Sequence, residues 1–159
     1  MHCDGACRGN PGPGGFAAIL GSGPRERVIA GFSPETTNNR MELLAAIEGL
    51  EALPEGAGVE VRTDSEYVVK GMTRWIEGWK RKGWRTASRA PVKNRDLWER
   101  LDRACARRRA RWVWIRGHAG DPGNEQCDEL ANEAIRRGLR GEIPPRPEGM
   151  PPKEKGLGL

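Results

Sequence analysis

The sequence predicts one α/β domain in which a single mixed β-sheet is covered by helices. Two observations predict this class. Two apolar runs, residues 16–20 and 28–32, are joined by a Gly/Pro turn and so indicate an antiparallel hairpin. Further along, strand-like runs alternate with amphipathic helical segments, and such connections bring later strands into the same sheet. At 159 residues the chain can bury one sizeable core.

The remaining elements follow in order. Asp4 lies on a short strand before the hairpin, and a first helix runs from Asn39 to Pro54, where proline and glycine stop it. A strand, two short helices, a longer helix, a strand and a last helix are then predicted over residues 59–63, 65–72, 75–82, 97–105, 111–116 and 124–137. The domain therefore spans residues 1–139. Residues 140–159 hold five prolines and four glycines without an apolar periodicity, and we expect a disordered tail there.

Positive charge is concentrated in one segment. The net charge is +5, but residues 74–95 alone carry +7 and the rest of the chain −2. Such segregation indicates a surface that binds a polyanion. Trp75 and Trp79 lie one helical turn apart in this segment, followed by three cations that begin at Lys80, which suits contacts with phosphates, sugars and bases. In the alternative interpretation, the tryptophans are core residues and the cations a solvated face.

Composition also bounds the cellular setting. No apolar run is long enough to cross a membrane, and the N-terminus lacks the charged-then-apolar pattern of a signal peptide. The four cysteines form no CxxC pair and show no zinc spacing with either histidine. We therefore expect reduced thiols in a cytoplasmic protein that has no membrane contact.

Four acids stand at the margins of predicted elements: Asp4, Glu42, Asp64 and Asp128. Asp4 and Asp64 are expected at the ends of their strands, where ligands bind in α/β sheets. Carboxylates at short range repel one another, so a convergent group needs cations. Oxygen ligands favour Mg²⁺ or Mn²⁺ over zinc, and two such ions can activate a water and stabilise the leaving oxygen of a phosphodiester.

These residues also have structural interpretations. Asn39 and Glu42 have the spacing of a capping box, so Glu42 could serve only the helix start. The other three acids could be turn, helix-start or flanking residues. His118 lies in a glycine-containing loop, where it suits a proton shuttle near neutral pH, and a lone surface histidine is the alternative.

The chain closely resembles bacterial type 1 ribonuclease H. The matching segments follow the family's order over about 130 residues: DGACRGNPGPGG (4–15), TTNNRMEL (36–43), TDSEYV (63–68), WKRKGW (79–84), PVKN-DLW (91–98) and GHAG…NEQCDELA (117–131). The resemblance implies a ribonuclease H-like fold with a mixed five-stranded sheet flanked by helices. It also implies endonucleolytic cleavage of the RNA strand of RNA/DNA hybrids, leaving 5′-phosphate and 3′-hydroxyl ends.

The resemblance implies roles for individual residues. The four acids look like ligands of two Mg²⁺ ions, with Mn²⁺ as a substitute, and His118 looks like the loop histidine that assists turnover. Positions that resemble contacts with the hybrid, including a DNA phosphate pocket at Thr37, are Cys7, Asn10, Thr37, Asn38, Asn39, Trp75, Trp79, Lys80, Arg81 and Lys82. Glu66 departs from the family, in which many members carry Gln.

Two rival functions stay open at this point. One is another nuclease of the same fold, such as a junction resolvase, and the other is a catalytically weak module that binds hybrids or double-stranded RNA. Metal-dependent cleavage of a labelled hybrid separates them. We also expect a monomer. Because only three residues precede Asp4, we expect the natural protein to carry several further residues before Met1.

Overall fold

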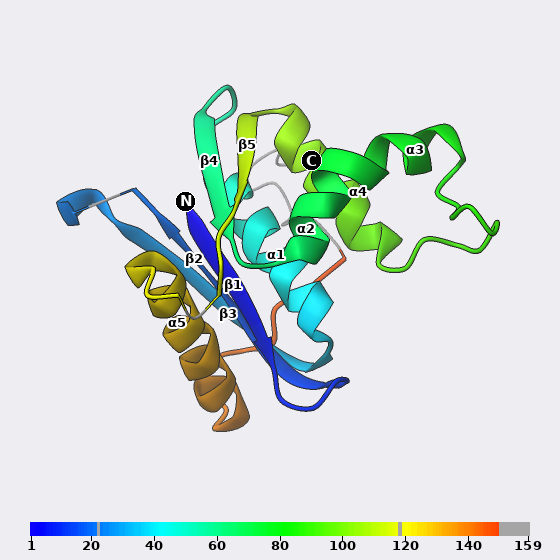
Figure 1. Ribbon diagram of the computed structural model, residues 1–159. Coiled ribbons are helices and arrows are strands. Elements are labelled where there is room, and N and C mark those ends of the chain that lie inside the picture. Colours follow the sequence, from blue (N-terminus) through cyan, green and yellow to red (C-terminus); the bar gives the residue numbers. More distant parts are fainter. Residues whose placement is uncertain (22, 118, 150–159) are drawn as a thin grey trace, which may run out of the picture.

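A five-stranded sheet in the order β3-β2-β1-β4-β5 forms the centre of the protein (Figure 1). The structure, a computed structural model, describes residues 1–21, 23–117 and 119–149. The strands are β1 His2–Cys7, β2 Gly12–Leu20, β3 Arg27–Thr36, β4 Gly58–Thr63 and β5 Arg109–Trp114. The first three pair antiparallel, whereas β4 pairs parallel with both β1 and β5. The predicted mixed five-stranded α/β fold is confirmed.

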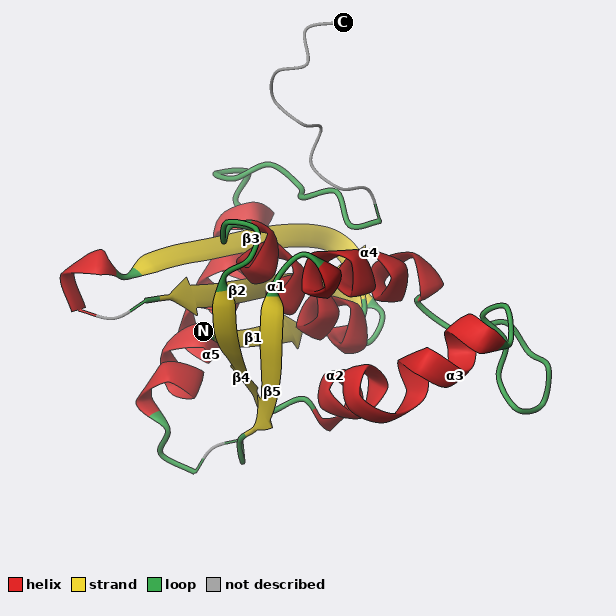
Figure 2. Ribbon diagram, turned by 90° about the horizontal axis from the view of Figure 1, so that it is seen from above, coloured by secondary structure: helices red, strands yellow, loops and turns green. Residues whose placement is uncertain are grey.

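Helices cover both faces of the sheet (Figure 1 and Figure 2). They are α1 Asn38–Glu51, α2 Glu66–Lys70, α3 Ile76–Arg81, α4 Arg95–Ala106 and α5 Pro122–Leu139. Adjacent residues of a strand face opposite sides of the sheet. In β2, Gly14 lies against Met41 of α1, and the next residue, Gly15, lies against Ala131 of α5, so these two helices cover opposite faces. Among the helices described, none has the length and apolar character needed to span a membrane.

The main core lies between the sheet and the helices α1 and α4. Every residue of α1 from Met41 to Leu50 is buried, because the helix is enclosed by the sheet on one side and by α4 on the other. Trp98 of α4 is fully buried in this core. The first turns of α1 are therefore held rigidly against β1.

Residues 66–81 form one continuous helical run, whereas the sequence predicts two separate helices. One turn of π-helix, Gly71–Trp75, follows α2 directly and leads into α3. Ser65 caps the run, since its Oγ accepts a hydrogen bond from the backbone N–H of Val68 at 3.2 Å. A Cβ at Gly71 would overlap the Trp98 ring. The π-helical turn thus keeps the chain helical while its glycine packs closely on α4.

The expectation of a disordered tail is wrong for residues 140–149, which lie against the domain. The Glu148 carboxylate accepts hydrogen bonds from Thr36 Oγ1 at 2.8 Å and from Arg40 Nε at 3.1 Å. The contacts are mostly polar, and the segment is proline-rich and has no regular secondary structure. No apolar periodicity in the sequence therefore indicates them. Residues 150–159, the rest of the expected tail, lie outside the described residues.

Candidate active site

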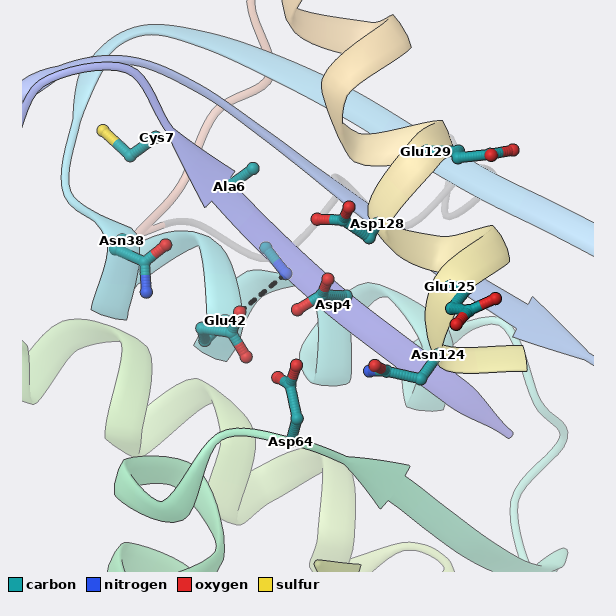
Figure 3. Close-up of a pocket in the computed structure, with 11 residues that line it drawn as sticks. Asp4, Ala6, Cys7, Asn38, Glu42, Asp64, Asn124, Glu125, Asp128 and Glu129 are labelled. Atoms are coloured by element: carbon teal, nitrogen blue, oxygen red, sulfur yellow. Dashed lines mark hydrogen bonds between the residues drawn. The ribbon is translucent and has the colours of Figure 1, made fainter. Parts of the chain in front are cut away.

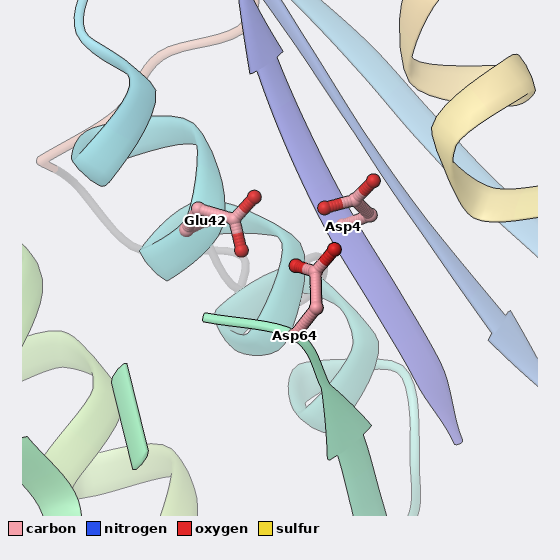
Figure 4. A group of neighbouring side chains, drawn as sticks. All are labelled: Asp4, Glu42 and Asp64. Atoms are coloured by element: carbon pink, nitrogen blue, oxygen red, sulfur yellow. The ribbon is translucent and has the colours of Figure 1, made fainter. Parts of the chain in front are cut away.

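Asp4 lies in the middle of β1, and the expectation that it ends its strand is wrong. β1 continues beyond it, whereas β4 ends just before Asp64. His2 pairs with Arg62 in parallel, so continuing the register brings residue 64 level with residue 4. The early end of β4 therefore turns the Asp64 side chain toward Asp4 (Figure 4).

Glu42 reaches the same place from α1. Its Oε1 accepts a hydrogen bond from the backbone N–H of Gly5 at 2.9 Å (Figure 3). This N–H needs a partner because β4 has ended and offers no carbonyl on that side of β1. A Cβ at Gly5 would lie 2.5 Å from the backbone nitrogen of Glu42, so only glycine allows the strand and the helix to approach this closely.

The capping-box interpretation of Glu42 is wrong. Thr37, and not Asn39, caps α1: its Oγ1 accepts a hydrogen bond from the backbone N–H of Arg40 at 3.2 Å. The cap thus lies two residues earlier than this interpretation requires, and Glu42 lies beyond the N–H groups that a cap serves. Its carboxylate is directed to the strand and serves the site.

Asp4, Glu42 and Asp64 form a three-acid cluster. One carboxylate oxygen from each lies within 4.8 Å of the other two (Figure 4). Asp4 and Glu42 are each only 5% exposed. The Oε2 atom of Glu42 is buried and has no hydrogen-bond partner among the described residues. A buried orphan oxygen beside two further carboxylates fits a hard divalent cation.

The protonation of the cluster reflects its burial. Burial raises the pKa of Asp4 to about 7, and the charges of Asp64 and Asp128 act in the same direction. Burial also raises the pKa of Glu42 well above its usual range, with the charge of Asp4 as the next cause. A cation favours the ionised carboxylates and therefore opposes both shifts.

Asp128, the fourth predicted acid, lies outside the three-acid cluster but lines the same pocket of about 540 Å³. It projects from α5 toward Asp4 (Figure 3). Its Oδ1 atom is 3.4 Å from the side-chain nitrogen of Asn132, which is a weak restraint. Three predicted acids therefore converge, and the fourth faces them across the pocket. His118 lies outside the described residues.

The pocket contains three side chains that the sequence analysis missed: Asn124, Glu125 and Glu129 of α5. Asn124 is 4% exposed, and its side-chain nitrogen has no hydrogen-bond partner among the described residues. Its spacing of four residues from Asp128 could have revealed it, because residues four apart share one helical face. The Glu129 carboxylate is directed away from the other acids (Figure 3).

Several predicted substrate contacts meet at the start of α1. Cys7 and Asn38 line the acidic pocket. Asn10 in the Gly/Pro loop accepts a hydrogen bond through Oδ1 from the backbone N–H of Asn38 at 3.1 Å. Thr37 caps the helix, and Asn39 is exposed beside it. The Gly/Pro loop and the helix start thus form one polar surface next to the acids.

The predicted tryptophan pair belongs to a larger aromatic cluster. Trp79 is half-buried, with its ring centroid 5.3 Å from that of Trp98, 5.8 Å from Trp75 and 6.3 Å from Trp84. Trp75 is the outer member and is 37% exposed. The cluster anchors α3 to α4 and leaves Trp75 open to solvent. Both interpretations of the segment therefore apply, core for Trp79 and surface for Trp75.

The three predicted cations at the end of α3 differ in their surroundings; Lys80 and Arg81 belong to the helix, and Lys82 directly follows it. Lys80 forms an ion pair with Asp102 of α4, with 3.2 Å between Nζ and Oδ2. Arg81 and Lys82 are exposed, and neither forms an ion pair within the described part of the chain. Two of the three cations are therefore unneutralised and available to an anion.

This mixed sheet, with acids from β1, α1 and the end of β4 in one pocket, defines a ribonuclease H-like fold with a carboxylate site. Comparison with known proteins gives the family. The family model described as RNase H matches residues 1–136. Ribonuclease H of Syntrophotalea carbinolica is 58% identical over 143 residues, which cover 90% of this chain and 94% of the relative. The chain belongs to the ribonuclease H family.

Solved structures agree with this assignment. The crystal structure of LC9-RNase H1 has a TM-score of 0.75 and 34% identity and covers 89% of this chain and 72% of its own. LC11-RNase H1, solved in complex with an RNA/DNA hybrid, has a TM-score of 0.68 and 28% identity over 87% of this chain and 96% of its own. The present chain is therefore similar to its relatives in both sequence and fold.

Proposed function

We propose that this protein is an endonuclease that hydrolyses the RNA strand of RNA/DNA hybrids and leaves 5′-phosphate and 3′-hydroxyl ends. The observation that carries this function is the convergence of Asp4, Glu42 and Asp64 within 4.8 Å in a chain of the ribonuclease H family. The hybrid in the structure of the relative LC11-RNase H1 supports the substrate class.

Divalent cations fit the three-acid cluster, and Mg²⁺ is the proposed ion, with Mn²⁺ as a substitute. Asp4, Glu42 and Asp64 hold the cations, and Asp128 completes the ligand set from across the pocket. When bound, two such cations activate the attacking water and stabilise the leaving oxygen. The support is the donor chemistry: all ligands are carboxylate oxygens, and one of them is buried without a partner among the described residues.

The surrounding residues bind the substrate. The helix start at Thr37 receives a DNA phosphate, because the helix dipole favours anions there. Cys7, Asn10, Asn38 and Asn39 contact the hybrid beside it, where short polar groups meet the 2′-hydroxyls that distinguish RNA from DNA. The DNA strand passes over a second surface, formed by Trp75, Trp79, Lys80, Arg81 and Lys82.

His118 acts as a proton shuttle in this proposal. The support is chemical, because an imidazole titrates near neutral pH and can exchange protons with the reacting oxygens. A positioned shuttle contributes a factor of roughly 10²–10⁴. His118→Ala should therefore slow turnover and leave measurable activity, and complete loss in a folded variant would point to a metal ligand instead.

The proposed enzyme acts as a monomer in the cytoplasm. Its cysteines are all free, which fits a reducing compartment: Cys3, Cys7, Cys105 and Cys127. Burial raises the pKa of both Cys105 and Cys127 to about 12, so these thiols stay protonated and unreactive.

The deciding experiment incubates a labelled RNA/DNA hybrid with the protein and Mg²⁺, beside duplex DNA, duplex RNA and a DNA junction. We expect cleavage of the hybrid alone. Asp64→Asn should abolish cleavage while metal-free binding of the hybrid survives, because the basic surface is unchanged. Cleavage of the junction in place of the hybrid, or near-normal cleavage by Asp64→Asn, would overturn the proposal.

A further inference from the structure

A second pocket opens beside the three-acid cluster, with a volume of about 350 Å³. It is lined by residues of the 66–81 helical run and by the last residue of β5: Glu66, Val69, Lys70, Thr73, Arg74 and Trp114. The two sites are joined directly, because the indole N–H of Trp114 donates a hydrogen bond to the backbone carbonyl of Asp64 at 3.1 Å.

Trp114 is an exposed ring in a fixed position. It is 46% exposed. Its only polar atom is satisfied by Asp64, so the ring is oriented by that bond and by the backbone of β5. A flat aromatic surface held in this way is a platform on which a nucleobase can stack.

The pocket carries one uncompensated positive charge. Lys70 forms an ion pair with Glu66, with 2.9 Å between Nζ and Oε2, so these two charges neutralise each other. Arg74 is exposed and forms no ion pair with any residue that the structure describes. The Thr73 hydroxyl donates to the carbonyl of Val69 at 2.6 Å and is already engaged. Arg74 is therefore the group that can receive a phosphate.

We propose that this pocket binds an unpaired nucleotide of the RNA strand where it leaves the hybrid, with the base on Trp114 and the phosphate on Arg74. The inference rests on the proposed function, because cleavage of the RNA strand at Asp64 brings its flanking nucleotides to Trp114. Inside a duplex the faces of the bases are covered by their stacked neighbours. An exposed ring can stack on a base only where the strand is single.

The test compares KM values for a blunt hybrid and for the same hybrid with an unpaired RNA extension at its 5′ or 3′ end. We expect one extension to lower KM at least about fivefold, the lower end of the effect of one stacked base. Trp114→Leu and Arg74→Gln should each bring the ratio of the two KM values toward 1. Because the ratio compares two substrates on one protein, a general loss of folding or activity affects both values alike.

Matched controls separate the contributions. Arg107→Gln removes the same charge at the opposite end of β5, where Arg107 pairs with Glu55 at 3.3 Å, and should keep the ratio unchanged. An abasic extension retains phosphates without bases. The part of the decrease in KM that depends on Trp114 should therefore disappear with this substrate. A ratio near 1 in the unaltered protein, or an unchanged ratio in both pocket variants, would overturn the inference.

The experiment distinguishes a wrong assignment of this pocket from a wrong assignment of the hybrid-cleaving function. The same ratio is measured for dissociation constants in EDTA, which requires no cleavage. If the protein cleaves the blunt and the extended hybrids with equal KM, the role of the pocket is rejected and the proposed hydrolysis of hybrids is retained. Absence of hybrid cleavage rejects the function, and the dissociation constants then decide whether the extension is bound at Trp114 and Arg74.

Discussion

The backbone N–H of Gly5 donates a hydrogen bond to Oε1 of Glu42 at 2.9 Å, which joins the central strand to the first helix (Figure 3). The bond fixes one carboxylate oxygen and leaves Oε2 buried and without a partner among the described residues. It forms because β4 ends early and leaves the N–H of Gly5 open on that side. The end of one strand thus positions an acid on a different element.

Gly5→Ala should disable the site. The added Cβ would overlap the backbone of Met41 and of Glu42, so α1 must move away from β1. Overpacking of this kind costs typically about 1–3 kcal/mol, and we expect the loss in the free energy of unfolding together with a strong loss of cleavage. Urea unfolding and hybrid cleavage measure the two effects.

Gly78→Ala is the matched control for Gly5→Ala. A Cβ at Gly78 meets nothing within 4 Å, and alanine favours a helix over glycine. This variant should unfold at equal or higher urea concentration and cleave normally. Normal cleavage by Gly5→Ala would contradict the role assigned to the bond with Glu42.

The metal-free protein should lose stability as the pH rises from about 4 to about 7. Burial raises the pKa of Asp4 from 3.8 to about 7, so the folded state binds more protons than the unfolded state in this window. The contribution of Asp4 to the free energy of unfolding is fully present below its unfolded-state pKa of 3.8 and is lost as the pH rises through its folded-state pKa of about 7. One pKa unit corresponds to about 1.4 kcal/mol, and we expect a fall of at least that size.

Urea unfolding in EDTA at pH 5 and pH 8 measures this fall. Asp4→Asn cannot ionise and should reduce it. Mg²⁺ added at pH 8 should restore stability, because it binds the ionised carboxylates that the metal-free fold disfavours. Equal pH dependence in Asp4→Asn and the unaltered protein would show that other groups cause the effect.

The sequence predicts most of the helices and strands well because they follow from local patterns. The hairpin, the Ser65 cap and the alternation of residues 59–63 each depend on neighbouring residues alone. The position of Asp4 within β1 could not be predicted, because β1 continues to Cys7 through its pairing with β2 on the far side of the Gly/Pro loop. The true cap of α1 was missed because Thr37 and Asn39 are both good capping residues.

Two other features arise only in three dimensions. The pairing of Lys80 with Asp102 joins two helices, and no spacing in the sequence indicates it. The contacts of Glu148 with β3 and α1 join residues more than 100 positions apart. Polar partners of this kind leave no hydrophobic periodicity, so the sequence pattern resembles that of a disordered tail.

Ending the chain at Gly141 should lower the stability of the domain. Arg100 is 2% exposed, and it donates through Nη1 to the backbone carbonyl of Glu148 at 2.7 Å. Arg146 forms an ion pair with the buried Glu48 and donates through its backbone N–H to a carbonyl of β3. A buried polar group left without its partner costs about 1–3 kcal/mol, so we expect a loss of at least about 2 kcal/mol.

Urea unfolding of three chains tests this contribution. A chain ending at Gly149 retains the contacts described above for residues 142–149 and is the reference for the shorter chain. Glu148→Gln keeps the backbone carbonyl that Arg100 uses and should fall between the two truncated chains. Equal midpoints for the chains ending at Gly141 and Gly149 would show that the segment adds no stability.

Arg81 and Lys82 should carry the salt dependence of hybrid binding on α3, and Lys80 should not. Removing one cation that binds a phosphate reduces the slope of log K against log salt concentration by about 0.9 on duplex-like substrates, so Arg81→Gln with Lys82→Gln should reduce it by about 1.8. Lys80→Gln should change the slope little, because Asp102 already neutralises that charge at 3.2 Å. Metal-free titrations of a hybrid at several salt concentrations measure both slopes, and kcat at saturating substrate should stay near normal. A larger change in slope for Lys80→Gln than for the double variant would mean that Lys80 leaves Asp102 to bind the DNA strand.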